Sequence, residues 1–133
     1  MSETITQKPS TDIEPELQFS ILCDRVVITP SGKPNFEEVF SLIIRPSRIR
    51  YFMVNRYING VGAFRQKIRV YKPDTREFRD SPELTFKLED RALAFDAVAQ
   101  IETNFDRPGV WWIQILLNEK NILSYPLPIL EGP

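Results

Sequence analysis

The groups of this chain that could do acid–base chemistry or bind a metal are mainly carboxylates, because the sequence contains no histidine and only one cysteine, Cys23. Without histidine, Ser-His-Asp and Cys-His nucleophile pairs, imidazole bases and histidine-ligated metals are impossible within the chain. One cysteine excludes an internal disulfide and a cysteine-rich metal site. We interpret Cys23 as a small buried apolar residue of a strand rather than as a reactive thiol.

The carboxylates do not form a catalytic pattern. Glu37-Glu38 and Glu89-Asp90 are adjacent pairs, and neighbours along a strand point to opposite faces of their sheet. Acidic residues alternate over 12–16 like calcium ligands, but no glycine or closing glutamate follows at EF-hand spacing. The sequence therefore predicts no enzyme, no catalytic residue, no cofactor and no metal.

The basic residues gather in one stretch of the chain. There are 17 bases against 18 acids, but the 35 residues between Glu38 and Asp74 contain 8 bases and no acid. These bases are Arg45, Arg48, Arg50, Arg56, Arg65, Lys67, Arg69 and Lys72. A basic face with interleaved tyrosines suits a nucleic acid, whose phosphates attract cations and whose bases stack on aromatic rings. The alternative is a face whose cations pair with acids of the same molecule, a subunit or a partner protein, which a pI near 5.5 favours.

Short β-rich runs separated by proline and glycine must position these residues. A chain of 133 residues with 42% apolar residues suits one domain with a real core. The expected strands cover 17–28, 36–44, 48–57, 62–71, 83–88, 93–103, 110–118 and 122–130. We predict an all-β protein, an antiparallel β-sandwich of about seven or eight strands. The run 93–103 also fits a helical stripe, and we favour a strand because its neighbours are strands.

The chain divides into a tail and a domain. Residues 1–16 mix Ser, Thr, Glu, Gln and Pro without periodicity, so we expect a flexible N-terminal tail followed by one β-sandwich domain over 17–133. The N-terminus has neither a basic start nor an apolar stretch, and no apolar run approaches the length of a membrane-spanning helix. These features predict a cytoplasmic protein with no membrane partner.

Turn and packing motifs recur along the domain. They are Phe19-Ser20-Ile21-Leu22-Cys23-Asp24, Gly32-Lys33 with Phe36 and Phe40, Tyr51–Arg56, Tyr71-Lys72-Pro73-Asp74, Pro108-Gly109-Val110-Trp111 and Pro126-Leu127. With these motifs the chain resembles, over most of residues 19–129, a bacterial family of small β-sandwich proteins with no assigned activity. It is also similar to immunoglobulin-like modules. The resemblance implies a fold and transfers no functional residue.

The direction of the basic side chains depends on how 48–57 pairs with 62–71. We expect a hairpin with the loop 58–60 and Gly60 in the left-handed conformation, because this register separates apolar from charged residues. The core side then holds Phe52, Val54, Phe64, Ile68 and Val70, with Arg50, Arg56 and Gln66 falling on the same side near the sheet ends. The outer face holds Tyr51, Met53, Arg65, Lys67, Arg69 and Tyr71.

The C-terminal hairpin adds a second candidate contact. Alternation groups Trp111 with core residues and places Trp112 on or near the surface, where tryptophan often anchors a binding interface. The alternative is that Trp112 packs against a covering loop. Pro126 and Pro128 remove two N–H groups from the same side of the last strand, which predicts an edge strand.

Together these features predict a non-catalytic interaction or assembly module with a charge-polarised surface. We expect a protein partner or a homo-oligomer. The alternative is a nucleic-acid-binding module that uses the basic 45–72 hairpin. The candidate surface consists of Tyr51, Met53, Arg65, Lys67, Arg69, Tyr71 and Trp112.

Overall fold

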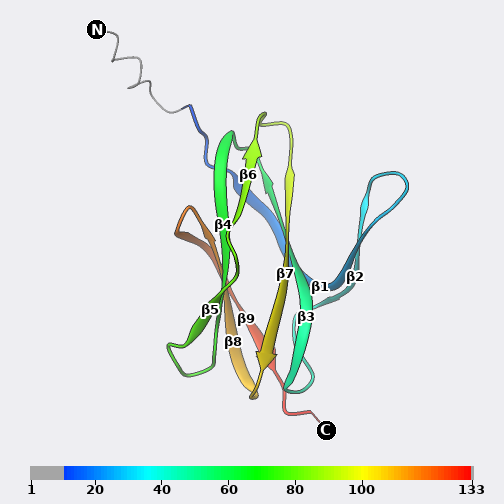
Figure 1. The fold of residues 1–133 in the computed structure, drawn as a ribbon, viewed down its shortest axis with the longest axis vertical. Helices are drawn as coiled ribbons and strands as arrows, with labels where there is room; N and C mark the ends of the chain where they lie inside the picture. Colours follow the sequence, from blue (N-terminus) through cyan, green and yellow to red (C-terminus); the bar gives the residue numbers. More distant parts are fainter. Residues whose placement is uncertain (1–10, 133) are drawn as a thin grey trace.

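The alternating runs form strands of two antiparallel sheets that pack face to face and are seen edge-on in Figure 1. The structure is a computed structural model, and it describes residues 11–132. The four-stranded sheet has the order β2-β1-β3-β7. Its strands are β1 (Glu16–Ile28), β2 (Pro34–Phe40), β3 (Ser47–Ile58) and β7 (Phe95–Phe105).

The five-stranded sheet has the order β5-β4-β8-β9, with β6 also paired to β4. Its strands are β4 (Gly62–Tyr71), β5 (Phe78–Asp80), β6 (Leu84–Leu88), β8 (Gly109–Leu117) and β9 (Lys120–Ile129). β5 and β6 lie one after the other along the same edge of β4. Between these two strands, the Ser81 N–H donates to the Ile68 carbonyl of β4 at 2.8 Å.

The all-β prediction is confirmed, since the described residues contain no helix. Each predicted run overlaps a strand, and 93–103 is a strand, β7, rather than a helix. The short strand β5 was not predicted. β9 is an edge strand of its sheet, as the two prolines indicated.

The predicted hairpin between 48–57 and 62–71 is wrong. β3 pairs with β1 on one side and with β7 on the other, so it has no free side for β4. Instead, the chain crosses from one sheet to the other at 59–61. The left-handed residue of this crossover is Asn59, with φ of 61°, rather than Gly60.

The crossover is covered by the segment that leads into β1. Ile13 and Val61 exchange two backbone hydrogen bonds of 2.8 and 2.9 Å, and Pro15 is buried. Residues 12–15 therefore belong to the domain, although they were expected in the flexible tail. Glu16, the last residue of that predicted tail, begins β1, and residues 1–10 lie outside the described residues.

Position 60 has no room for a side chain, because Pro15 lies against Gly60. A Cβ at Gly60 would come within 2.7 Å of the Pro15 Cα. Because that atom belongs to the backbone, the segment around Pro15 would have to move to relieve the contact. We expect Gly60→Ala to detach residues 12–15 and to speed amide exchange at Ile13 and Val61 in hydrogen-exchange mass spectrometry. At Gly32 a Cβ has nothing within 4 Å, although its φ of 85° strains an alanine, so Gly32→Ala affects only the turn between β1 and β2 and should leave those amides unchanged. Equal protection in Gly60→Ala and the wild type would contradict this contact.

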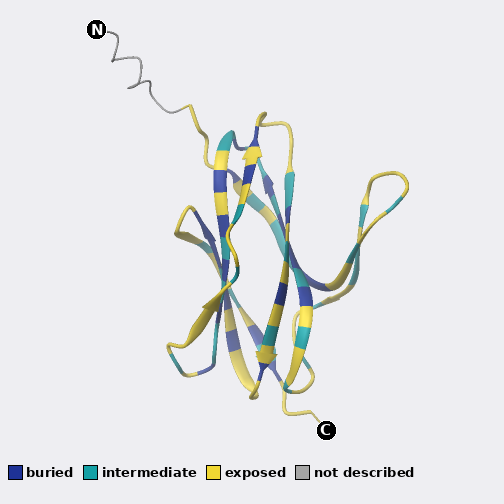
Figure 2. Ribbon diagram, in the orientation of Figure 1, coloured by how far each residue is buried: buried dark blue, intermediate teal, exposed yellow. Residues whose placement is uncertain are grey.

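The core lies between the sheets, and buried and exposed residues alternate along most strands (Figure 2). Tyr51 and Met53 are 0% exposed, so their predicted place on the outer face is wrong. The Tyr51 hydroxyl hydrogen-bonds to Thr103 at 3.0 Å, and burial raises the pKa of Tyr51 to about 12. Phe64, Ile68 and Val70 are buried as predicted.

Two polar side chains join the sheets inside the core. Asn55 and Gln66 are 0% and 1% exposed, and the Asn55 amide nitrogen donates to the Gln66 side-chain oxygen at 2.8 Å. The Tyr57 hydroxyl donates to the same oxygen at 2.7 Å, and burial raises the pKa of Tyr57. We call Asn55, Tyr57 and Gln66 the buried polar cluster. Gln66, expected at a sheet end, instead lies in the middle of β4.

Cys23 is buried, as its interpretation as a small apolar strand residue required. Burial also raises the pKa of its thiol, which keeps the group protonated near neutral pH.

Candidate interaction surface

The outward side chains of β4 are those that alternation predicted. Phe64, Gln66, Ile68 and Val70 face the core, so Arg65, Lys67, Arg69 and Tyr71 point away from it. β8 lies beside β4 and presents Trp112, a residue 45% exposed, on the same face, while Trp111 is 2% exposed. Five of the seven predicted surface residues therefore share the outer face of the five-stranded sheet.

A row of ring-bearing side chains crosses this face at right angles to the strands. Tyr71 pairs with Phe78 of β5 on one side and with Trp112 of β8 on the other, and Trp112 pairs with Pro126 of β9. The rings of Tyr71 and Phe78 are 5.1 Å apart, and Phe78 is 45% exposed. We call Phe78, Tyr71, Trp112 and Pro126 the aromatic band.

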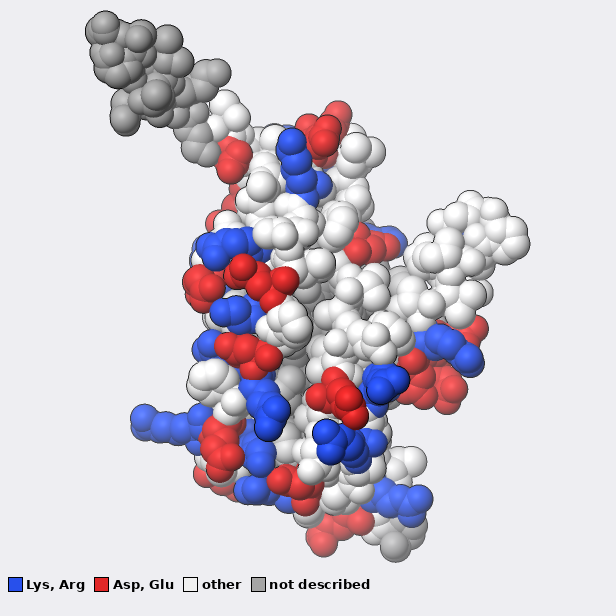
Figure 3. Space-filling model, viewed as in Figure 1, with Lys and Arg blue, Asp and Glu red and all other residues white. Residues whose placement is uncertain are grey.

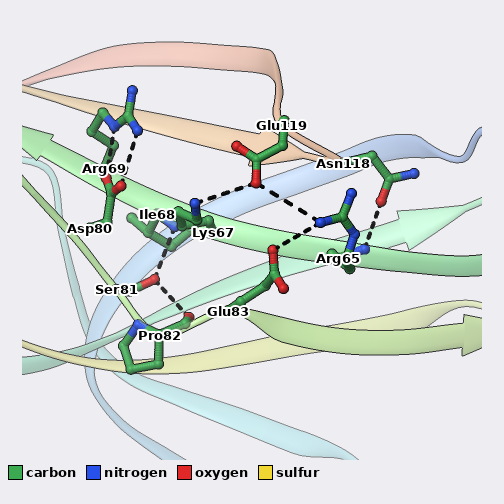
Figure 4. A network of polar contacts seen from close by, with 10 residues as sticks. All are labelled: Arg65, Lys67, Ile68, Arg69, Asp80, Ser81, Pro82, Glu83, Asn118 and Glu119. Atoms are coloured by element: carbon green, nitrogen blue, oxygen red, sulfur yellow. Dashed lines mark hydrogen bonds and ion pairs between the residues drawn. The ribbon is translucent and has the colours of Figure 1, made fainter.

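Ion pairs lie beside the band on β4 and its neighbours (Figure 4). Arg69 donates to both carboxylate oxygens of Asp80, at 2.7 and 3.0 Å, and its guanidinium lies 4.1 Å from the centre of the Phe78 ring. Lys67 lies 3.4 Å from Glu119, and Arg65 lies 3.4 Å from Glu83 and 4.0 Å from Glu119. The three outward bases of β4 are therefore each paired with an acid of the same chain.

The Arg69–Asp80 pair should be visible in a titration. The Arg69 hydrogen bonds lower the pKa of Asp80 below its ordinary value of 3.8. The stability that this carboxylate adds is thus complete above that value and is lost as pH falls below it. We expect Arg69→Gln to raise the Asp80 pKa toward 3.8, measured by NMR of the carboxyl carbon. The control variant Arg25→Gln removes a separate ion pair, Arg25–Glu37, and should leave the Asp80 pKa unchanged. An unchanged Asp80 pKa in Arg69→Gln would show that Arg69 is not the cause of the lowered value.

Arg48, Arg50 and Arg56 belong to the other sheet, because β3 and β4 lie in different sheets, while Arg45 precedes β3 and Lys72 follows the end of β4. Arg48 pairs with Glu102 at 3.1 Å, Arg56 pairs with Asp96, and Lys72 pairs with Asp106 at 3.1 Å. With Arg65, Lys67 and Arg69, six of the eight bases have an acidic partner. Blue and red atoms accordingly alternate down the visible face in Figure 3. The stretch does not form one basic surface.

A polar cleft of about 450 Å³ opens between β5 and β7. Its charged lining residues include the paired Arg48, Lys72, Glu102 and Asp106. Lys72 and Arg107 lower the pKa of Asp106, which favours its charged form. No group of three or more His, Cys, Asp or Glu that could hold a metal occurs within 11–132. In the same part of the chain, no helix is long and apolar enough to cross a membrane.

Among the surface residues that sequence reasoning missed are Phe78 and Asp80, because the strand that carries them is only three residues long. An alternation signal cannot be recognised over so short a run. Comparison with known proteins adds no assignment: no protein-family model matches the chain, and no curated protein matches it significantly.

Proposed function

We propose that this protein is a non-catalytic interaction module, an immunoglobulin-like β-sandwich related to the bacterial family that its turn motifs resemble. Its contact surface is the aromatic band with the ion pairs beside it. The observation that carries this proposal is the exposure of Trp112 and Phe78, each 45%, in one row on a regular sheet face. Large exposed aromatic residues supply much of the binding energy of protein interfaces.

The charges favour a protein partner over a nucleic acid. Binding to phosphates requires cations that are free to replace counterions, and Arg65, Lys67 and Arg69 are each paired with a carboxylate. The aromatic band is apolar, and the charged residues beside it are paired with one another. An apolar centre with polar groups around it is typical of protein–protein interfaces.

Site-specific photo-crosslinking tests the proposal. A benzophenone amino acid replaces Trp112 in one variant and Val98 in the other, since Val98 is 40% exposed on the four-stranded sheet and serves as the matched control. Each full-length variant is irradiated in extract of cells that make the protein. We expect discrete protein adducts at position 112 and markedly fewer at position 98. No adduct at position 112, equal labelling at both positions, or crosslinking at 112 to nucleic acid alone would overturn the proposal.

A further inference from the structure

The outer face of the five-stranded sheet divides lengthwise into a charged half and an uncharged half. Arg65, Lys67 and Arg69 of β4 form the charged half together with Asp80 and Glu83 on its far side. The strands β8 and β9 contain no charged residue over 109–117 and 121–129. Glu119, in the turn between them, pairs back onto Lys67.

Two rows of side chains cross the line between β4 and β8. In the pairing of these strands, Tyr71 lies beside Trp112 and Arg69 lies beside Gln114. One strand further out on each side, Phe78 occupies the same row as Pro126. A twofold axis that runs along this line would exchange β4 with β8, and β5 with β9, between two molecules facing each other.

Such an axis brings complementary groups together. Tyr71 of one molecule would face Trp112 of the other, and Phe78 would face Pro126, so ring surfaces meet ring surfaces. Arg69 would face Gln114, whose side-chain oxygen accepts hydrogen bonds. The charged half of each copy then covers the uncharged half of its partner.

We infer that the partner of this surface is a second copy of the chain, joined face to face about this twofold axis. The inference rests on the proposed function and names its partner. A twofold contact requires one patch to be complementary to itself, and the lengthwise division of charge meets this requirement. The net charge of −1 adds little repulsion between copies. When two sheets pack face to face, the strand directions of the two sheets differ by about 30°. At this angle, several rows of side chains near the axis are in contact.

Sedimentation equilibrium of the purified full chain tests the inference. We expect a reversible species of twice the 15.5 kDa chain mass. Trp112→Glu places a carboxylate at the centre of the contact and should weaken association at least about 30-fold. The matched variant Val98→Glu, on the other sheet, should associate like the wild type. Thermal unfolding confirms that each variant is folded.

Crosslinking of a mixture of ¹⁵N-labelled and unlabelled protein tests the axis itself. With the benzophenone at position 112, we expect mixed-isotope crosslinks to peptides around Tyr71 and Phe78 of the other copy. A monomer at all concentrations, equal weakening by both glutamate variants, or mixed-isotope crosslinks confined to other regions would overturn the inference. If the purified chain is monomeric while position 112 still forms protein adducts in extract, the second copy is excluded and the proposed function stands. Without adducts in extract, the proposed function itself fails.

Discussion

Replacing Trp111 with alanine should lower the free energy of unfolding by about 4 kcal/mol, whereas Trp112→Ala should lower it by less than about 1 kcal/mol. Trp111 is 2% exposed, and its ring meets that of Phe105 edge-on with their centres 4.9 Å apart. Its indole N–H also donates to the Arg107 carbonyl at 3.1 Å. Truncation removes these contacts and leaves a large cavity between the sheets.

Urea denaturation followed by far-UV circular dichroism measures both variants. If the alanine variant does not fold, Trp111→Phe takes its place in the measurement. This variant keeps an aromatic ring but loses the indole N–H. It should be intermediate, with a loss of about 2 kcal/mol. Similar losses for Trp111→Ala and Trp112→Ala would show that the two side chains are not divided between core and surface.

Gln66→Leu should destabilise the domain by about 3 kcal/mol although leucine has a similar size. The Gln66 side-chain oxygen accepts hydrogen bonds from Asn55 and from Tyr57, at 2.8 and 2.7 Å, and its loss leaves both donors buried without this partner. An unsatisfied buried donor costs about 1–3 kcal/mol. Gln100→Leu, at an exposed position of β7, should change the free energy of unfolding by less than about 0.5 kcal/mol.

A combined variant separates hydrogen bonding from packing. Replacing the whole buried polar cluster, with Asn55→Leu, Tyr57→Phe and Gln66→Leu, removes the unpaired donors together with their acceptor. It should therefore be less destabilised than the sum of the three single variants, and denaturation curves give this difference directly. Additive losses, or a neutral Gln66→Leu, would show that the cluster does not act as one hydrogen-bonded unit.

Alternation predicted the orientation of a strand well where one of its faces is charged. On β4, charged side chains alternate with apolar ones, and the outward positions of Arg65, Lys67 and Arg69 follow from sequence alone. The same reasoning separated Trp111 from Trp112, because the neighbours of Trp111 on one face are all apolar. Arg65, Lys67, Arg69 and Trp112 are four of the seven residues predicted for the candidate surface.

Alternation failed on β3, where both faces carry apolar residues. Tyr51 and Met53 lie on one face, Phe52 and Val54 lie on the other, and Val54 is also 0% exposed. Orientation then depends on which strands lie on either side of β3, and this is set by contacts far away in the sequence. Asn59-Gly60 resembles a hairpin turn, but the pairing of β3 with β1 and β7 determines that the chain leaves the sheet there.

The matching of the basic stretch with acids has a consequence for synthesis of the chain. Its ion pairs join Arg48, Arg56 and Lys67 to acids 54, 40 and 52 residues later. During translation, these three bases are therefore made 40 to 54 residues before their acidic partners. Residues 1–73 contain 11 bases and 7 acids, and residues 74–90 contain 3 bases and 6 acids, so the net charge of the growing chain is near zero before β7 is made. The acidic partners of Arg48, Arg56 and Lys67 nevertheless follow later, on β7 and in the β8–β9 turn. These ion pairs therefore stabilise the completed fold and contribute little to the structures that form first.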